Sequence, residues 1–263
     1  MLKKIIDKLF SIFDLKVIKL ENYKTLTKLP RSVYVYALLN EKEKNKVSNY
    51  LNASKSQLGQ DIFVIAKTDK EKNNFFVEFG ATDGITNSNT FLLEKELNWK
   101  GILIEPAKIW HKNLFKNRDC IIDTRCIYTI SGKKMPFLVV ENDGKAEPGL
   151  STLKKYAQNG DWASNIRKNK SSQHFVETID LNELLDFYNA PDLIQYMSID
   201  TEGSEFEILN NFDFSIRKIY IISVEHNFHN SQRKKIFELL ISKGYKRIFE
   251  NISQFDDWYI LKP

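Results

Sequence analysis

The stretch Phe75-Phe-Val-Glu-Phe-Gly-Ala-Thr-Asp-Gly-Ile-Thr-Asn-Ser-Asn-Thr90 decides the fold, because an apolar run ends in an acid, a glycine and an Asp-Gly pair. The apolar run predicts a strand, while Gly80 and Gly84 permit a tight turn or the close approach of a ligand to the backbone. Residues 88–97 then carry apolar side chains at helical spacing, and residues 101–106 supply a second apolar strand that ends in an acid. The sequence therefore predicts a strand-helix-strand unit whose turn holds a nucleoside-containing ligand.

The residues around this turn indicate which nucleoside ligand fits. Glu105 follows Gly84 by 21 positions, near the spacing of about 20 at which a carboxylate accepts the ribose hydroxyl protons. Thr82 stands where a dinucleotide fingerprint has its second glycine, so NAD is disfavoured, and no ATP phosphate-binding motif follows the strand. S-adenosylmethionine fits better, because it has a ribose, no phosphate, and an ammonium that Glu78 or Asp83 could neutralise. The alternative is that Glu78 and Asp83 only cap the turn and the helix.

Several motifs occur in an order that resembles the FkbM group of S-adenosylmethionine-dependent methyltransferases. They are Val77–Gly84, Ser88–Thr90, Trp99–Pro106, Ser198–Glu205 and Val224–Asn227. The resemblance spans residues 70–260 approximately and implies a class I methyltransferase fold and methyl transfer, commonly to a hydroxyl of a sugar or a natural product. The residues expected to bind the cofactor are Glu78, Gly80, Ala81, Asp83, Gly84, Asn89, Thr90, Glu105 and Pro106.

The rest of the chain predicts an α/β fold, a Rossmann-like doubly wound sheet of seven mostly parallel strands with the last one antiparallel. Further strands are expected at 120–128, 136–141, 193–199, 219–224, 247–252 and 258–261, and further helices at 111–116, 180–188 and 231–243. Asp180 is expected to cap the helix that follows it, and Ser204 with Glu207 to form a capping box. Residues 1–70 are expected to form an N-terminal helical cap, and residues 71–263 the methyltransferase domain.

Residues 142–172 form the longest stretch without clear periodicity. Loops of this length are often functional, so the segment could close over an acceptor; simple surface disorder is the competing explanation. Its candidate acceptor contacts are Ser151, Tyr156, Trp162 and Arg167.

The chemical site is expected where the fourth and fifth strands end, because ligands of such sheets bind outside the carboxyl ends of the strands. Methyl transfer to a sugar hydroxyl needs a positioned base or a metal that acidifies the hydroxyl. His226 could be the base, oriented by Asp200 or Glu225. Alternatively Asp200 and Glu225, with His226 or Asn227, could hold Mg or Mn. The candidate catalytic and metal-binding residues are thus the same three, although His226 could instead only satisfy its loop.

Composition limits the partners and the location. The chain has 263 residues, 39 Lys plus Arg against 34 Asp plus Glu, and no basic stripe, so a nucleic-acid partner is not expected. Cys120 and Cys126 lie on one expected strand and are too few for a zinc site or a disulfide framework, which favours buried thiols and a cytoplasmic location. Residues 2–13 form an expected amphipathic helix that could pack on the domain, on a second subunit in a homodimer, or peripherally on a membrane.

The function expected from the sequence is an S-adenosylmethionine-dependent O-methyltransferase acting on a carbohydrate hydroxyl, of a nucleotide-activated sugar or a surface polysaccharide precursor. The alternatives are a methyltransferase of a small natural product or a lipid-linked acceptor, a catalytically inactive binding module of the same fold, and an NAD-linked oxidoreductase.

Overall fold

The structure is a computed structural model that describes residues 30–68, 74–142, 145–146, 149–158, 160 and 163–263. The amphipathic helix expected at residues 2–13 and Trp162 lie outside these residues. Within the described ranges, no helix is both long and apolar enough to cross a membrane.

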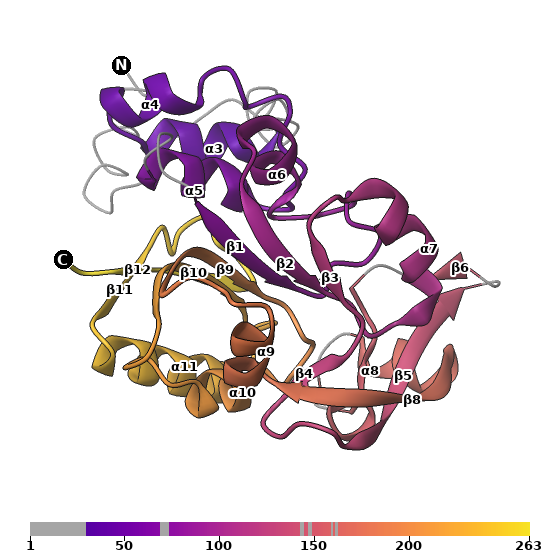
Figure 1. The fold of residues 1–263 in the computed structure, drawn as a ribbon. Helices are drawn as coiled ribbons and strands as arrows, with labels where there is room; N and C mark the ends of the chain where they lie inside the picture. Colours follow the sequence, from indigo (N-terminus) through magenta and orange to yellow (C-terminus); the bar gives the residue numbers. More distant parts are fainter. Residues whose placement is uncertain (1–29, 69–73, 143–144, 147–148, 159, 161–162) are drawn as a thin grey trace, which may run out of the picture.

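A seven-stranded sheet runs through the centre of the molecule (Figure 1). Its strands lie in the order β11-β12-β10-β9-β1-β2-β3, and only β12 runs antiparallel to its neighbours. The predicted mostly parallel sheet with an antiparallel last strand is confirmed. The bounds are β1 Phe75–Phe79, β2 Lys100–Ile104, β3 Ile121–Asp123, β9 Leu193–Ile199, β10 Lys218–Glu225, β11 Tyr245–Ile248 and β12 Asp256–Leu261.

Helices cover both faces of this sheet, because each strand turns alternate side chains to opposite faces. In β1, Val77 and Phe79 pack into one apolar cluster and Phe76 into the other. The first cluster is covered by α9 (Leu181–Phe187), α10 (Glu205–Asn211) and α11 (Asn230–Ser242). The second is covered by α3 (Arg31–Leu38), α4 (Glu41–Val47), α5 (Gln60–Lys67), α6 (Phe91–Leu97) and α7 (Lys108–Asn117).

The described part of the N-terminal segment packs directly on the sheet. The ring of Phe63 in α5 stacks on that of Trp258 in β12, with 5.3 Å between their centroids. Since α5 also reaches the edge of the site described below, this segment takes part in shaping it.

A second sheet, which the sequence pattern does not predict, lies beside the first (Figure 1). Its order is β4-β8-β5-β6, with β7 paired to β5, and all of it lies between β3 and β9 along the chain. The bounds are β4 Cys126–Tyr128, β5 Lys134–Asn142, β6 Lys145–Ala146, β7 Thr152–Leu153 and β8 Ser171–Asp180, with a 3₁₀ turn η1 at Lys154–Tyr156 and α8 at Ser164–Asn169. The strand predicted at 136–141 is thus confirmed within β5.

Two predictions for this region are wrong. Residues 120–128 form two strands in different sheets, because Asp123 Oδ1 accepts a hydrogen bond from the backbone N–H of Arg125 at 2.7 Å and turns the chain between them. Cys120 and Cys126 therefore share no strand face, although both are free thiols and Cys126 is buried. Residues 142–172 are not irregular throughout, since they contain β7, η1 and α8. The first half of β8 is mostly exposed, so it lacks the apolar alternation that marks a strand.

The two predicted helix caps have different outcomes. The Asp180 side chain accepts hydrogen bonds from the backbone N–H groups of Asn182 and Glu183, which confirms that cap. The predicted capping box of Ser204 and Glu207 is wrong: Ser204 makes no cap hydrogen bond, and Glu207 accepts from the Tyr128 hydroxyl at 2.7 Å instead.

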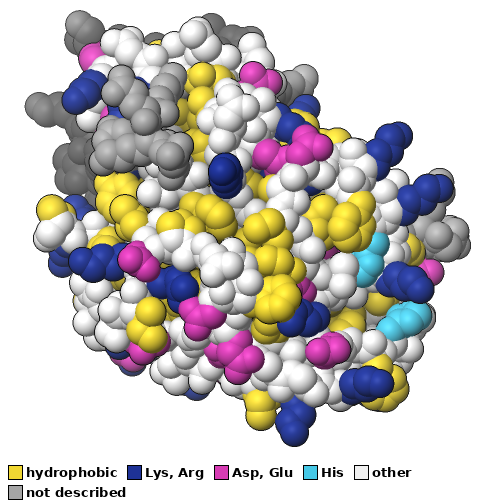
Figure 2. All heavy atoms as spheres, in the orientation of Figure 1, with side chains coloured by type: hydrophobic (Ala, Val, Ile, Leu, Met, Phe, Trp, Pro, Cys, Tyr) yellow, Lys and Arg dark blue, Asp and Glu magenta, His cyan; other side chains and the backbone are white. Residues whose placement is uncertain are grey.

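Over the described part of the face in Figure 2, Lys and Arg side chains are dispersed among acids, as on a solvated surface.

Candidate active site

Two adjoining cavities lie at the carboxyl ends of β1, β2, β9 and β10. We call them the apolar lobe, of about 580 Å³, and the polar lobe, of about 1090 Å³. Six residues line both lobes and so mark their junction: Phe79, Gly80, Thr82, Gly149, Asp200 and Glu202.

The turn after β1 requires its glycine. Gly80 has a φ of +73°, and a Cβ atom there would lie 2.5 Å from the backbone oxygen of Asp200 at the end of β9. The backbone N–H groups of Gly80 and Ala81 donate to Ile104 O, which ties the turn to β2. A side chain at Gly80 would therefore push the two central strand ends apart, at the junction of the lobes.

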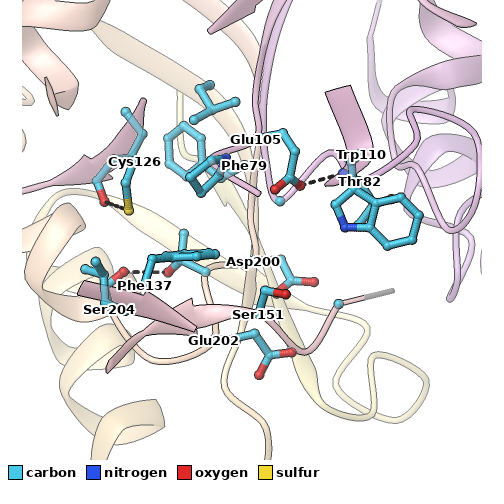
Figure 3. A pocket seen from close by; sticks show the side chains of 17 residues that line it. Phe79, Thr82, Glu105, Trp110, Cys126, Phe137, Ser151, Asp200, Glu202 and Ser204 are labelled. Atoms are coloured by element: carbon cyan, nitrogen blue, oxygen red, sulfur yellow. Dashed lines mark hydrogen bonds between the residues drawn. The ribbon is translucent and has the colours of Figure 1, made fainter. Parts of the chain in front are cut away.

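Glu105 points into the apolar lobe from the end of β2 (Figure 3). Its two carboxylate oxygens accept hydrogen bonds from the backbone N–H groups of Thr82 and Ala107, each at 2.8 Å. The side chain is buried, and burial raises its pKa to about 7 against the effect of these two hydrogen bonds. Each oxygen keeps a further lone pair for a ligand donor.

Glu78 lines the polar lobe and also holds the loop that follows β1. Its carboxylate accepts from Ser88 Oγ at 2.9 Å, from the Asn89 backbone N–H at 2.7 Å and from Thr90 Oγ1 at 2.5 Å. The fully buried Arg118 contacts the same loop, donating to Gly84 O, Ser88 Oγ and Thr90 Oγ1 and pairing with Glu94 at 2.6 Å.

The other expected cofactor residues fall into two groups. Ala81 and Asn89 line the polar lobe, where the Asn89 amide donates to Ser198 Oγ at 2.9 Å, and Pro106 lines the apolar lobe. Asp83, Gly84 and Thr90 line neither lobe. Asp83 instead accepts from the backbone N–H groups of Ile85 and Thr86, as in the capping alternative. A Cβ atom at Gly84 would lie 2.6 Å from the Arg118 side chain. These three residues support the turn and loop after β1 without lining either lobe.

Three carboxyl groups meet at the ends of β9 and β10. Oxygen atoms of Asp200, Glu202 and Glu225 lie within 4.8 Å of one another. Asn227 Nδ2 donates to Glu225 Oε2 at 2.8 Å and to Glu202 Oε2 at 3.0 Å. Arg167 Nη2 lies 2.5 Å from the same Glu202 oxygen, so a buried cation from α8 contacts the group.

Burial and crowding hold protons on this group. Burial and the neighbouring carboxylates, that of Asp256 foremost, raise the pKa of Asp200 to about 8. Burial and then Asp200 raise the pKa of Glu225 well above its usual range. The ionised form of a carboxyl with such a raised pKa is a stronger base than an ordinary exposed carboxylate.

His226 is not brought together with Asp200 and Glu225. Its ring lines neither lobe and is 3% exposed. Nδ1 accepts from the backbone N–H of Phe228 at 3.0 Å, and Nε2 lies 3.8 Å from Asp257 Oδ1. Burial lowers its pKa to about 4. The structure therefore places Glu202 in the position that the sequence interpretation gave to His226.

Sequence reasoning does not reveal several residues of the lobes. The apolar lobe is also lined by Trp110, Cys126, Phe137 and Leu153, and the polar lobe by Gln57, Gln60, Asn87, Phe255 and Asp256. Gln60 Nε2 donates to Asp256 Oδ2 at 2.8 Å. Of the acceptor contacts expected in residues 142–172, Ser151 lines the apolar lobe, whereas Tyr156 and Arg167 line neither.

The chain is similar to known proteins in sequence and in structure. A family model described as the methyltransferase FkbM domain matches residues 78–253. A solved methyltransferase FkbM from Methylobacillus flagellatus KT is similar over 90% of this chain, with 9% identity and a TM-score of 0.44, and the chain spans 60% of that protein's length. A fibrillarin/Nop5p complex is similar over 79% of this chain and 81% of the other, with 13% identity and a TM-score of 0.40. A precorrin-6y C5,15-methyltransferase from Geobacter metallireducens GS-15 is similar over 79% of this chain and 89% of the other, with 12% identity and a TM-score of 0.40. The comparison with curated proteins gives no match.

Proposed function

This chain belongs to the FkbM methyltransferase family, and from that premise we propose that it transfers a methyl group from S-adenosylmethionine to a carbohydrate hydroxyl, in a nucleotide-activated sugar or a surface polysaccharide precursor. The observation that carries this proposal is the lining of the polar lobe. Five of its residues are amides: Gln57, Gln60, Asn87, Asn89 and Asn227. Amides both donate and accept hydrogen bonds, which matches the paired donor and acceptor character of sugar hydroxyls. Phe255 adds an apolar surface for a ring face.

The apolar lobe suits the nucleoside part of S-adenosylmethionine. Glu105 would accept the two ribose hydroxyl protons with its remaining lone pairs. Trp110 and Phe137 would give the adenine ring flat apolar contacts. Gly80 lets the rest of the cofactor pass close to the backbone at the junction, so that the methyl group faces the polar lobe.

The chemistry needs the acceptor hydroxyl to lose its proton as the new bond forms. S-adenosylmethionine supplies an electrophilic methyl group, and its sulfur leaves as a neutral thioether. Asp200 lines both lobes and would take the proton of the hydroxyl, with Glu225 beside it to share that proton. Orienting the hydroxyl in line with the methyl group accounts for a further part of the rate.

A divalent cation is a second means of acidifying the hydroxyl, and the same group fits it. Asp200, Glu202 and Glu225 would hold Mg or Mn, which prefer carboxylate oxygens, and the cation would act as a Lewis acid. Arg167 already contacts one oxygen of Glu202, so the cation would share Glu202 with that guanidinium.

The first test is the thermal midpoint of dialysed protein with S-adenosylhomocysteine, with NAD, and with each plus Mn. Ligand at 100 times its Kd stabilises a protein by about 2.7 kcal/mol. Stabilisation by S-adenosylhomocysteine supports the cofactor, and stabilisation by NAD alone would contradict it.

The second test screens methyl transfer to nucleotide sugars, oligosaccharides, and small or lipid-linked acceptors, with and without EDTA. The proposed site would be supported if a carbohydrate is methylated and if Asp200→Asn and Glu225→Gln each lower the rate of that methylation about 100-fold or more. Turnover confined to non-carbohydrates would favour the natural-product alternative. Cofactor binding without turnover on any acceptor would favour an inactive binding module.

A further inference from the structure

The loop after β10 has an unusual backbone. Asn227 and Phe228 have φ angles of 46° and 60°, although neither is glycine. Side chains other than glycine rarely adopt this left-handed region, and consecutive residues do so only when surrounding contacts hold them. The Phe228 side chain is 65% exposed, and its ring contacts the ring of His226 edge to face, with 6.0 Å between the centroids.

The His226 side chain supplies one contact that holds this turn, beside the backbone hydrogen bonds of His226 and Asn227 to Phe255 O and of His229 to His226 O. Its Nδ1 accepts the hydrogen bond from the Phe228 backbone N–H at 3.0 Å, so Nδ1 carries no proton and the neutral ring is protonated at Nε2. Nε2 faces Asp257 Oδ1 at 3.8 Å, and Asp257 is itself fixed by Arg233, at 2.7 and 2.9 Å. The imidazole is thus held by its hydrogen bond at Nδ1, whereas Nε2 makes no hydrogen bond to the described residues.

The turn places the Asn227 side chain beside the carboxyl groups at the ends of β9 and β10. Its Nδ2 donates to carboxylates from two strand ends, Glu202 after β9 and Glu225 at the end of β10. The imidazole of His226 therefore contacts the turn, and Asn227, which is part of the turn, contacts the two carboxylates.

We propose that His226 is a positioning residue: it holds the left-handed Asn227–Phe228 turn, and thereby the Asn227 amide between Glu202 and Glu225. It touches neither the methyl donor nor the acceptor. The inference rests on the proposed function for its catalytic consequence, but its structural part can be tested without an acceptor.

The first experiment is a double-mutant cycle on the unfolding midpoint in urea. In His226→Asn, an oxygen replaces Nδ1 as the acceptor for the N–H two residues on, as in an Asx turn, whereas in His226→Gln the acceptor lies one bond further out. We expect H226Q to have the lower midpoint. Phe228→Gly keeps the N–H group but accepts a positive φ without strain, so the difference between H226N and H226Q should shrink in that background. An unchanged difference would overturn the proposal, and so would an H226Q protein that fails to fold in both backgrounds.

The second experiment uses the acceptor found by the screen described above. H226N should retain most of the kcat of the wild type, whereas H226Q should lower kcat about tenfold or more, with the Kd of S-adenosylhomocysteine unchanged in both. If His226 were the base or a metal ligand, both variants would lose about 100-fold or more, because both lack an imidazole. If the proposed function itself failed, the wild type would show no turnover while the urea cycle would still give its result.

Discussion

The pH dependence of cofactor binding tests the role of Glu105. Its pKa is raised to about 7 in the unliganded protein, mainly because the carboxyl is buried. Two ribose hydroxyls that donate to Glu105 would stabilise its ionised form, so the pKa of Glu105 should fall when the ligand binds. Below pH 7, binding then requires the loss of a proton, and affinity falls up to tenfold per pH unit.

The magnitude follows from the ionised fraction. With a pKa of about 7, this fraction falls about 30-fold from about pH 8 to about pH 5.5, and the Kd of S-adenosylhomocysteine should rise by that factor. The stability of the unliganded protein changes with pH in the opposite direction. The folded pKa of Glu105 exceeds the ordinary value of 4.5, so this group stabilises the fold by up to about 3 kcal/mol at low pH, and that contribution is lost as pH rises from 4.5 to about 7.

The assay is isothermal titration calorimetry with S-adenosylhomocysteine across this pH range, on the wild type, Glu105→Gln and Glu238→Gln. Glu238 lies on α11 with its side chain 62% exposed, so its variant controls for the removal of a carboxylate. We expect E105Q to bind S-adenosylhomocysteine more weakly, with an affinity that no longer falls about tenfold per pH unit at low pH. E238Q should show the same affinity and pH dependence as the wild type. Equal slopes for the wild type and E105Q would refute the role of Glu105, whatever the absolute affinities.

Three further perturbations test the charged and aromatic contacts. Arg118→Met removes the buried cation that pairs with Glu94 and lies near Glu78 under the loop after β1, and leaves Glu94 only the partly exposed Lys95 as a cationic partner within the described part of the chain, so it should cost about 3–5 kcal/mol in urea unfolding and weaken S-adenosylhomocysteine binding; Arg118→Lys should recover part of both. Arg167→Met should destabilise the protein by a similar amount, and Glu202→Gln added to it should restore much of the loss, because the carboxylate that contacts Arg167 is then absent as well; if the double variant is no more stable than R167M, the pair does not matter to folding. Trp110→Ala should weaken S-adenosylhomocysteine binding about tenfold with little change in stability, and Trp110→Phe should weaken it less; equal affinities would remove Trp110 from the adenine contacts.

The parts of the fold that the sequence predicts are those with local signals. Neighbouring residues alone indicate the strand Phe75–Phe79 and the turn after it, and the same holds for the apolar strands β9 and β10. The parallel order then follows from the helices between the strands. The second sheet has no comparable signal, because β8 faces water over half its length and β6 and β7 have two residues each.

The site is predictable to the level of strand ends and no further. Which side chain after a strand enters the cavity depends on backbone angles in the next few residues. Glu202 has a φ of 59° and Gly203 one of 128°, and this turn carries the Glu202 side chain to the group that His226 was expected to join. Contacts such as that of Gln60 with Asp256, 196 positions away, depend on packing that no local pattern contains.

The charge distribution of the polar lobe fits a cationic methyl donor. Five acids line it, namely Glu78, Asp200, Glu202, Glu225 and Asp256, and none of the described residues that line it is Lys, Arg or His. Two fully buried arginines compensate part of this charge from outside the lobe: Arg118 lies 3.7 Å from Glu78, and Arg167 contacts Glu202. The other three acids make no ion pair within the described part of the chain, and burial raises the pKa of each of them.

A sulfonium and an ammonium placed at the junction would supply the missing positive charge. Transfer of the methyl group converts the sulfonium into a neutral thioether, so the same carboxyls would hold the substrate form of the cofactor more tightly than its product form. In the proposed reaction, the carboxylate that takes the proton of the acceptor would also lose its negative charge. The site would thus lose one positive and one negative charge together, which would keep its electrostatic balance.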